Sequence, residues 1–230
     1  MESATKDQKA AGRCPFSGMS AAPQQTLSSR LREATAEAHN VAERHPVQGR
    51  MARGAASRED YANWLEQMYH LWTAVDTAVA VAAARDPRVR AMLKPYHTHG
   101  SRVEADLRFL GRTGARAAAS PGTQTMVDFI RSTGESAGPA VIGAWYVLEG
   151  SNNGGRFLAK ALSRGLELTG PQGVTSLDPH GEAQQERWLA WRSALDEQQF
   201  SEAERVAIID VASRTFAGLT PVFDDMPAAV

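Results

Sequence analysis

The 230-residue chain has little of several features that would each point to a particular class of protein. It contains one cysteine, Cys14, which rules out an internal disulfide framework and fits a reducing cytoplasm. Its formal net charge is -1, from 25 basic and 26 acidic residues, which gives no case for nucleic-acid binding. We therefore expect a cytoplasmic protein with no nucleic-acid partner.

Long apolar runs and dinucleotide signatures are missing too. The longest apolar stretches, such as Ala78 to Ala84, are far shorter than the ~18 residues needed to span a bilayer. The N-terminus lacks the charged-then-apolar pattern of a signal peptide, so we expect no membrane association. No Gly-x-Gly-x-x-Gly pattern is present, so a redox activity would need a separate electron donor.

What the sequence does have is helical periodicity. Residues 1–25 are polar and non-periodic and are predicted to be a disordered tail, whereas residues 26–226 are predicted to form one helical domain. No run of alternating β-branched residues demands a sheet. The predicted fold class is therefore all-α, a single-domain bundle of roughly eight helices.

Capping residues, prolines and glycines set the expected helix boundaries. The predicted helices cover about 27–44, 57–84, a short segment opened by Asp86-Pro87, 101–111, 123–132, 139–166, 182–195 and 201–223. Residues 165–180, rich in glycine, are predicted to form a connecting loop.

Three glycines, Gly150, Gly154 and Gly155, interrupt the long helix predicted for 139–166. Each glycine inside a helix costs roughly 1 kcal/mol relative to alanine, and such breaks of a local rule often mark functional sites. A spacing of four places Gly150 and Gly154 on one face, where a flat apolar ligand could lie against the backbone. The alternative is close helix packing without a ligand.

The first predicted helix carries His39 with Glu43 one turn later and Arg32 two turns earlier, all on one face. His39 is a candidate metal or heme ligand, and Glu43 could accept its Nδ1 proton and leave Nε2 free for iron. The alternative is a surface histidine paired with glutamate. Arg32, with Arg187 and Arg192 near the C-terminus, could bind acidic groups at the ligand's edge, although the last two would also suit a solvated face.

Two segments together resemble the heme oxygenase family. Residues 31–43 (LREATAEAHNVAE) are similar to its proximal helix, and residues 146–156 (YVLEGSNNGGR) are similar to its distal helix in the bacterial form with Glu-Gly-Ser. Weaker similarity in the same order extends the resemblance over about 27–223. The resemblance implies cleavage of heme, as both cofactor and substrate, to biliverdin, carbon monoxide and free iron. It also implies O2 and a ferredoxin- or reductase-type electron donor.

The resemblance assigns roles to particular residues. His39 would be the axial iron ligand and Glu43 its hydrogen-bond partner. Gly150 and Gly154, with Gly155 beside them, would form the distal backbone that steers bound O2 toward one carbon of the ring edge.

The remaining family positions concern the heme propionates and distal water. Arg32 and Arg192 fall where the family places basic residues for the propionates, and Arg187 lies beside Trp188, near the position of a family lysine. Ser151 occupies a position where many members have an acidic residue that holds a water molecule. Ser151 and its neighbours Asn152 and Asn153 are therefore candidates for the water network.

Two other functions remain open at this stage. The first is a heme carrier or sensor with the same pocket and no turnover. The second is a carboxylate-bridged two-iron site in the same helical scaffold. Its candidate ligands are Glu66 and His70, which share a helical face, together with His39, Glu43 and Glu149.

Three further histidines and the tail cysteine are also candidate metal or heme ligands. His97, His99 and His180 lie in predicted loops and are expected to be surface residues. The pair Cys14-Pro15 could bind heme through its thiolate, but a solvent-exposed thiol in the tail is favoured. The sequence does not indicate the oligomeric state.

Overall fold

The structure of the protein, a computed structural model, describes residues 25–136 and 138–226. Within these residues it has nine α-helices and no strand, which confirms the predicted all-α fold class. The helices are α1 (Leu27–Arg44), α2 (Pro46–Ala52), α3 (Arg58–Arg85), α4 (Pro87–Met92), α5 (Gly100–Phe109), α6 (Pro121–Glu135), α7 (Ile142–Gly165), α8 (Gln184–Asp196) and α9 (Glu202–Asp224). Short 3-10 helices cover Pro95–His97, Pro139–Val141 and Gly181–Ala183. The predicted disordered tail and Cys14 lie outside the described residues, apart from Gln25.

Capping residues fix the starts of the long helices as the sequence predicts. Ser57 accepts a hydrogen bond from the backbone N–H of Asp60, whose carboxylate accepts one from the Ser57 N–H in return. Ser201 and Glu204 form the same reciprocal pair at the start of α9. These bonds satisfy backbone donors that have no partner inside the helix.

Two helix starts differ from the prediction for one shared reason. α2 was not predicted, and α6 begins at Pro121 and ends at Glu135, whereas residues 123–132 were expected. In both cases a cap residue precedes a proline at the first helical position, where its missing N–H costs nothing. The cap of α2 is His45, whose Nδ1 accepts from the Val47 N–H, and the cap of α6 is Ser120.

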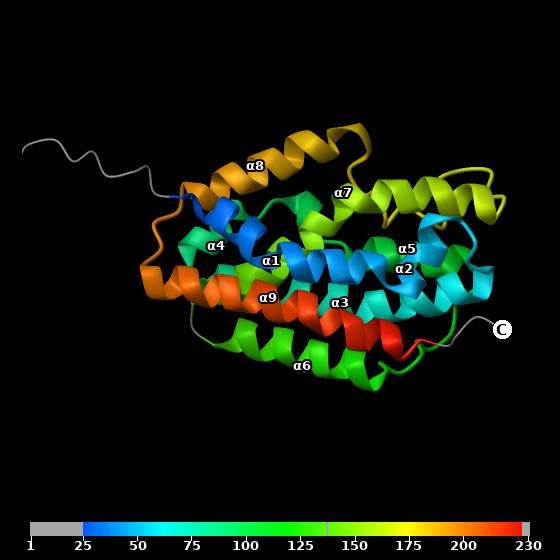
Figure 1. The fold of residues 1–230 in the computed structure, drawn as a ribbon, viewed down its shortest axis with the longest axis horizontal. Coiled ribbons are helices and arrows are strands. Elements are labelled where there is room, and N and C mark those ends of the chain that lie inside the picture. The colour runs from blue at the N-terminus through cyan, green and yellow to red at the C-terminus, as the bar shows by residue number, and fades with distance from the viewer. Residues whose placement is uncertain (1–24, 137, 227–230) are drawn as a thin grey trace, which may run out of the picture.

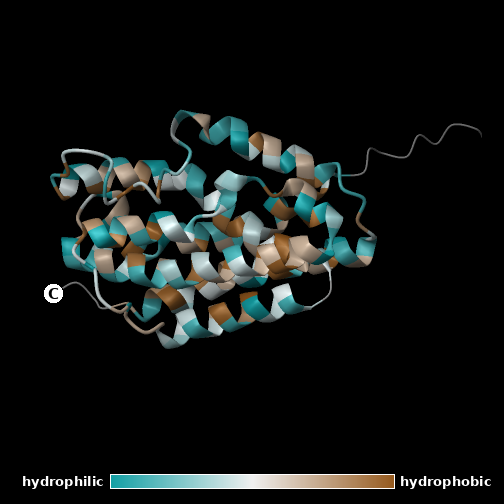
Figure 2. Cartoon of the chain, turned by 180° about the vertical axis from the view of Figure 1, so that it is seen from behind, coloured by the Kyte–Doolittle hydropathy of each residue, from teal (hydrophilic) through white to brown (hydrophobic). Residues whose placement is uncertain are grey.

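The core lies among α3, α6, α7 and α9. α9 packs against α1, α6 and α7, while α3 packs against α4, α5 and α6. Figure 1 shows α9 running between α1 and α6, with α8 at the opposite edge of the molecule from α6. Figure 2 shows hydrophilic residues mainly on the outward faces of the outer helices. α9 is long and apolar enough to span a membrane, but this composition also suits its packing inside the core.

The closest approach between α7 and α9 depends on Gly143. A Cβ at this position would collide with the Ile208 carbonyl oxygen and the Ala212 nitrogen of α9. Glycine here lets the two backbones touch, and this contact places the first turns of α7 against the core.

We predict that Gly143→Ala lowers the free energy of unfolding by about 1–3 kcal/mol, because overpacking at a backbone contact forces the helices apart. Gly154→Ala is the matched control, since a Cβ at Gly154 meets nothing within 4 Å. This control should be neutral or stabilise the protein by up to about 1 kcal/mol through helix propensity. Urea denaturation measures both, and equal effects would contradict the prediction.

Candidate functional site

α7 approaches the α1–α2 segment at two places. Near the start of α7, the partly buried Tyr146 lies close enough to Thr35, in the middle of α1, for that side chain to lower its pKa. Farther along, Gly54, just after α2, lies against the Ala161 carbonyl and Gly165 of α7. The two helices therefore run in the same direction (Figure 1), and they make little direct backbone contact with each other in the described residues.

His39 lies in the stretch of α1 between these two connections. It is one turn after Thr35, on the helix stripe that buries Leu31, Thr35 and Ala42. Nevertheless 50% of the His39 side chain is exposed, although its neighbours on the same stripe are buried. The ring is also held edge-on by Phe216 of α9, with the ring centroids 5.5 Å apart. Its Nε2 lies 3.6 Å from Glu43 Oε1, so the expected pair forms through Nε2, whereas Nδ1 was expected.

The three glycines of α7 have three different environments. Gly154 is exposed, and an added Cβ would meet nothing within 4 Å. At Gly150 the nearest atom to an added Cβ is Cη2 of the Trp188 indole, at 3.2 Å. Gly155 is buried, and its added Cβ would collide with the Leu177 carbonyl in the loop after α7. Close backbone packing therefore explains Gly155 but not Gly150 or Gly154.

The polar residues that follow Gly150 are engaged with α7 itself. Ser151 Oγ donates to the Leu148 carbonyl oxygen at 2.6 Å, and Asn153 Nδ2 donates to the Gly150 carbonyl oxygen at 2.9 Å. Asn152 is buried, and its Nδ2 has no hydrogen-bond partner among the described residues. Ser151 is exposed beside the glycines, whereas Asn152 lies on the buried side of the helix.

Two arginines from different helices approach the same tyrosine, Tyr146. Burial raises the pKa of Tyr146, while the neighbouring Thr35 side chain and the charges of Arg192 and Arg32 lower it. Arg32 of α1 and Arg192 of α8 thus both lie close enough to Tyr146 for their charges to act on it. Tyr146 also packs against Trp188, with the ring centroids 5.6 Å apart.

Arg187 is engaged elsewhere. Its Nη1 donates to His180 Nδ1 at 2.9 Å, and its guanidinium lies 4.2 Å from the centroid of the Tyr96 ring. It therefore belongs to a different cluster from Arg32 and Arg192.

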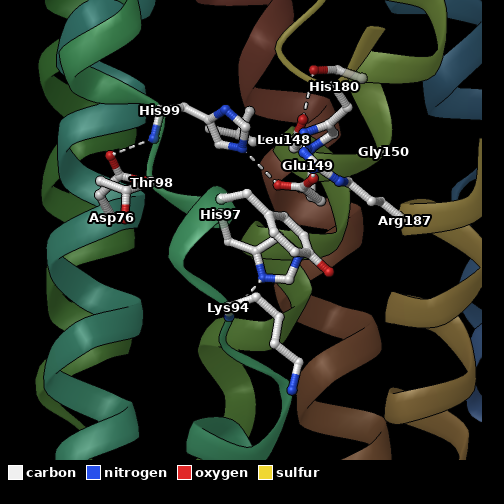
Figure 3. Close-up of polar contacts among 12 residues, drawn as sticks. Asp76, Lys94, His97, Thr98, His99, Leu148, Glu149, Gly150, His180 and Arg187 are labelled. Atoms are coloured by element: carbon white, nitrogen blue, oxygen red, sulfur yellow. Dashed lines mark hydrogen bonds and ion pairs between the residues drawn. The ribbon is translucent and has the colours of Figure 1, made fainter. Parts of the chain in front are cut away.

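That cluster surrounds Glu149, which directly precedes Gly150. Glu149 Oε2 accepts a hydrogen bond from His99 Nε2 at 2.8 Å, and Oε1 accepts one from His180 Nε2 at 2.9 Å. Figure 3 shows the two imidazoles reaching the carboxylate from either side. Burial by itself would raise the pKa of Glu149, but the hydrogen bonds from His180 and His99 outweigh it and lower the pKa to about 2. The carboxylate is therefore ionised inside the protein.

The prediction that His97, His99 and His180 are surface residues is wrong. Their exposed fractions are 4%, 0% and 7%. For His99 and His180 the physical reason is the charge at position 149, because a buried carboxylate must be paired or hydrogen-bonded. His97 is instead buried against Trp145, and its Nδ1 accepts from the Lys94 N–H. The signal was present in the sequence: Glu149 follows the apolar run Trp145–Leu148, and a charge on that buried face needs donors from other elements.

The tautomers of this cluster oppose metal binding. The ligand atoms of His99, Glu149 and His180 lie within 4.8 Å of one another, close enough to hold an ion by distance alone. However, Arg187 has only donors, so His180 Nδ1 must accept, and the ring proton stays on Nε2. A metal at Nε2 would move that proton to Nδ1, where it would face the Arg187 N–H. We therefore interpret the cluster as a hydrogen-bonded ion site.

The alternative two-iron site is not assembled. His70 Nε2 lies 2.8 Å from the Ala117 carbonyl oxygen, and Glu149 is bonded to His99 and His180. His39 is paired with Glu43 on α1. The residues proposed for two irons are thus distributed over separate contacts.

Comparison with known proteins places these features in a family context. The family model described as heme oxygenase matches residues 25–225. A heme oxygenase-2 from the cyanobacterium Synechocystis, solved with heme and NO, is 20% identical and has a TM-score of 0.81 over 88% of this chain and 85% of its own. The heme oxygenase of Leptospira interrogans is 23% identical, with a TM-score of 0.78 over 86% of this chain and 98% of its own.

The same fold is also found outside the heme oxygenases. A TenA family transcription regulator from Silicibacter is 15% identical, with a TM-score of 0.63 over 88% of this chain and 96% of its own. No curated protein sequence matches.

The buried histidine His97 leads to a prediction about acid stability. Burial lowers its pKa to about 4, even though the Glu149 charge raises it. Between about pH 6.5 and pH 4 the unfolded chain therefore binds a proton that the folded chain does not. The free energy of unfolding should fall by about 2–3 kcal/mol as the pH drops through this range. His97→Gln, which cannot titrate, should flatten this slope in pH-dependent urea denaturation, whereas the control His70→Gln should leave it unchanged. An unaltered slope in His97→Gln would count against the assignment.

Proposed function

Because the chain belongs to the heme oxygenase family, we propose that it cleaves heme oxidatively to biliverdin, carbon monoxide and free iron. One arrangement carries the proposal. A half-exposed imidazole, His39, lies on α1 in the stretch that runs beside α7, where Gly154 faces open space and the Trp188 indole lies against Gly150. A flat macrocycle with a central metal is the kind of ligand that needs an imidazole on one side and room against a backbone on the other.

The residues present fit heme as the substrate. Gly154 has open space where a side chain would stand, and the two carboxylates of heme suit the guanidinium groups of Arg32 and Arg192 near Tyr146. His39 would bind the iron through Nε2. Since Nε2 now faces Glu43, the ring must turn over so that Nδ1–H donates to Glu43, which fixes the tautomer.

When bound, heme supplies both the iron that activates O2 and the ring that is oxidised. The chain's own residues would confine that chemistry. In our proposal the backbone at Gly150 and Gly154 limits the space beside the iron and directs O2 toward one ring-edge carbon. Trp188 must shift, because its indole lies against Gly150.

Several further assignments complete the proposal. Ser151 is the polar group placed beside the glycines, whereas Asn152 and Gly155 support α7 from its buried side. Arg187 reaches a propionate only if it leaves His180. Electrons come from a ferredoxin- or reductase-type protein, and the reaction takes place in the cytoplasm.

A heme carrier or sensor is the second candidate. It is favoured by Ser151, which occupies the position beside Gly150 where many heme oxygenases have an acidic residue that holds water. The Ser151 hydroxyl is neutral and already donates to the Leu148 carbonyl. Turnover separates this candidate from the enzyme.

We predict that the purified protein binds hemin with a Soret band, and that His39→Ala loses this band because the iron loses its axial nitrogen. With a reductase system under air, the wild-type protein should release biliverdin, which absorption spectroscopy detects. A Soret band that persists under these conditions would support the carrier. The absence of any hemin binding would contradict both functions.

We predict that Gly154→Leu weakens hemin binding by at least about tenfold, which is the effect of losing ~1.4 kcal/mol of contact. The new side chain would occupy the space proposed for the macrocycle, while the fold should be unaffected because that space is open. Ser132→Leu, an exposed position on α6, serves as the matched control. Hemin titration followed at the Soret band measures both, and equal affinities would contradict the proposed location.

A further inference from the structure

The bare face of α7 cannot set the orientation of its own helix. Glycines are the poorest helix formers after proline. Gly154 contacts no neighbouring element, and Gly150 meets only the Trp188 indole of α8. The rotation and depth of this segment therefore depend on contacts that the other faces of α7 make.

Glu149 lies one residue before Gly150, about 100° around the helix on its buried side, and 3% of it is exposed. Its two oxygens accept hydrogen bonds from two different segments, His99 at the start of α5 and His180 in the loop before α8. Charge-assisted hydrogen bonds of this kind are stronger than neutral ones, and more so where water is excluded. One carboxylate thus ties α7 to both of its neighbouring segments.

Each histidine is itself anchored to a further helix. The backbone N–H of His99 donates to Asp76 Oδ2 of α3 at 3.0 Å, and His180 Nδ1 accepts from Arg187 of α8 at 2.9 Å. Figure 3 shows this chain of contacts from Asp76 through Glu149 to Arg187. α8 also carries Trp188, which covers Gly150, so the cluster ties α7 to the helix that packs over this glycine.

The loop that carries His180 is held from its other end by Asp106 of α5. Its carboxylate accepts from the Gly173 N–H at 3.0 Å, the Thr175 hydroxyl at 2.7 Å and the Ser176 N–H at 2.6 Å. His180 is therefore presented to Glu149 by a fastened loop.

The tautomers of His99 and His180 require a hydrogen-bond acceptor at position 149, which an ionised carboxylate supplies. With Arg187 donating to Nδ1 of His180, Nε2 of that ring must donate to residue 149. Arg102 lies 3.5 Å from Nδ1 of His99 and favours the same tautomer there. A carboxylate accepts both N–H groups, whereas an amide would turn its NH2 toward one of them.

From these contacts we propose that the His99–Glu149–His180 cluster is a positioning device, which holds the Gly150–Gly154 backbone at a fixed rotation facing His39. The inference rests on the proposed function, because heme is what the positioned backbone would receive. These residues touch neither the substrate nor the reacting atoms. Their effect is on how heme is seated and on which ring carbon is oxidised.

The first test needs no heme. In hydrogen–deuterium exchange of the heme-free protein, Glu149→Gln should speed exchange in the peptide covering residues 147–156 by at least about tenfold, while α6 stays unchanged. Glu186→Gln, an exposed glutamate on α8, is the control and should exchange like the wild-type protein. Wild-type exchange in Glu149→Gln would overturn the proposal. One tightly bound equivalent of zinc or iron in the purified protein would also overturn it, since the cluster would then be a metal site.

The second test reads heme seating. In proton NMR of the ferric hemin complex, the wild-type protein should show one set of heme-methyl resonances, and Glu149→Gln should show a second set together with a changed ratio of biliverdin isomers. His180→Gln, whose amide can donate to Glu149 and accept from Arg187, should retain the wild-type pattern, whereas His180→Leu should not.

If Glu149→Gln does not fold, Arg187→Met tests the same link, since it frees the His180 tautomer without leaving a charge buried. It should also produce the second set of resonances. A single unchanged set in Arg187→Met and His180→Leu would overturn the proposal. Hemin binding without biliverdin in the wild-type protein would instead refute the proposed enzyme and leave the exchange and seating tests valid.

Discussion

The proposed site depends on α7, whose face with Gly150 and Gly154 has few contacts, so that contacts on its other faces fix its position. α7 presents Gly154 to open space and Gly150 to the Trp188 indole, and its close backbone contacts lie at other positions. Gly143 allows contact with α9, Glu149 bonds to two histidines, and Gly155 allows contact with the Leu177 carbonyl. Glycine thus serves opposite purposes in one helix: at Gly143 and Gly155 it brings backbones together, and at Gly154 it leaves space open.

The way Glu149 is buried shows why this attachment is effective. Surface pairs such as Arg30–Glu202 contribute little, since water screens them and long side chains lose entropy. Glu149 is inaccessible, and both of its oxygens accept from rigid rings whose other nitrogens face arginines. Breaking such a set leaves a buried charge unpaired, which is strongly destabilising. The cluster therefore specifies a position more than it adds net stability.

The sequence was a good guide where the determining interaction is local. The caps at Ser57 and Ser201 and the ends of α1 depend on neighbours a few residues away. All of α2 and the first residues of α6 were missed, because Pro46 was interpreted as the stop of the preceding helix and Pro121 as part of a loop. His99 and His180 are far from Glu149 in the sequence but bond to it in the fold. The periodicity of one helix cannot predict such long-range contacts.

The candidate site divides in the same way. The pairing of His39 with Glu43 follows from helix geometry, and so does the shared face of Gly150 and Gly154. What the sequence could not supply was the partner of each group. Trp188 lies over Gly150, and Arg187 turns toward His180, because the path of the 166–183 connection decides where α8 is placed.

The fold alone does not decide between catalysis and other uses, since a TenA family regulator shares it. The stronger argument comes from Gly154. A Cβ there would meet nothing, so alanine would fit and would favour the helix by up to about 1 kcal/mol. Neither backbone packing nor a positive φ angle explains the glycine, because the residue lies inside a regular helix and is not among the glycines with positive φ. Folding therefore gives no reason for glycine at this position, whereas a flat ligand lying against α7 does.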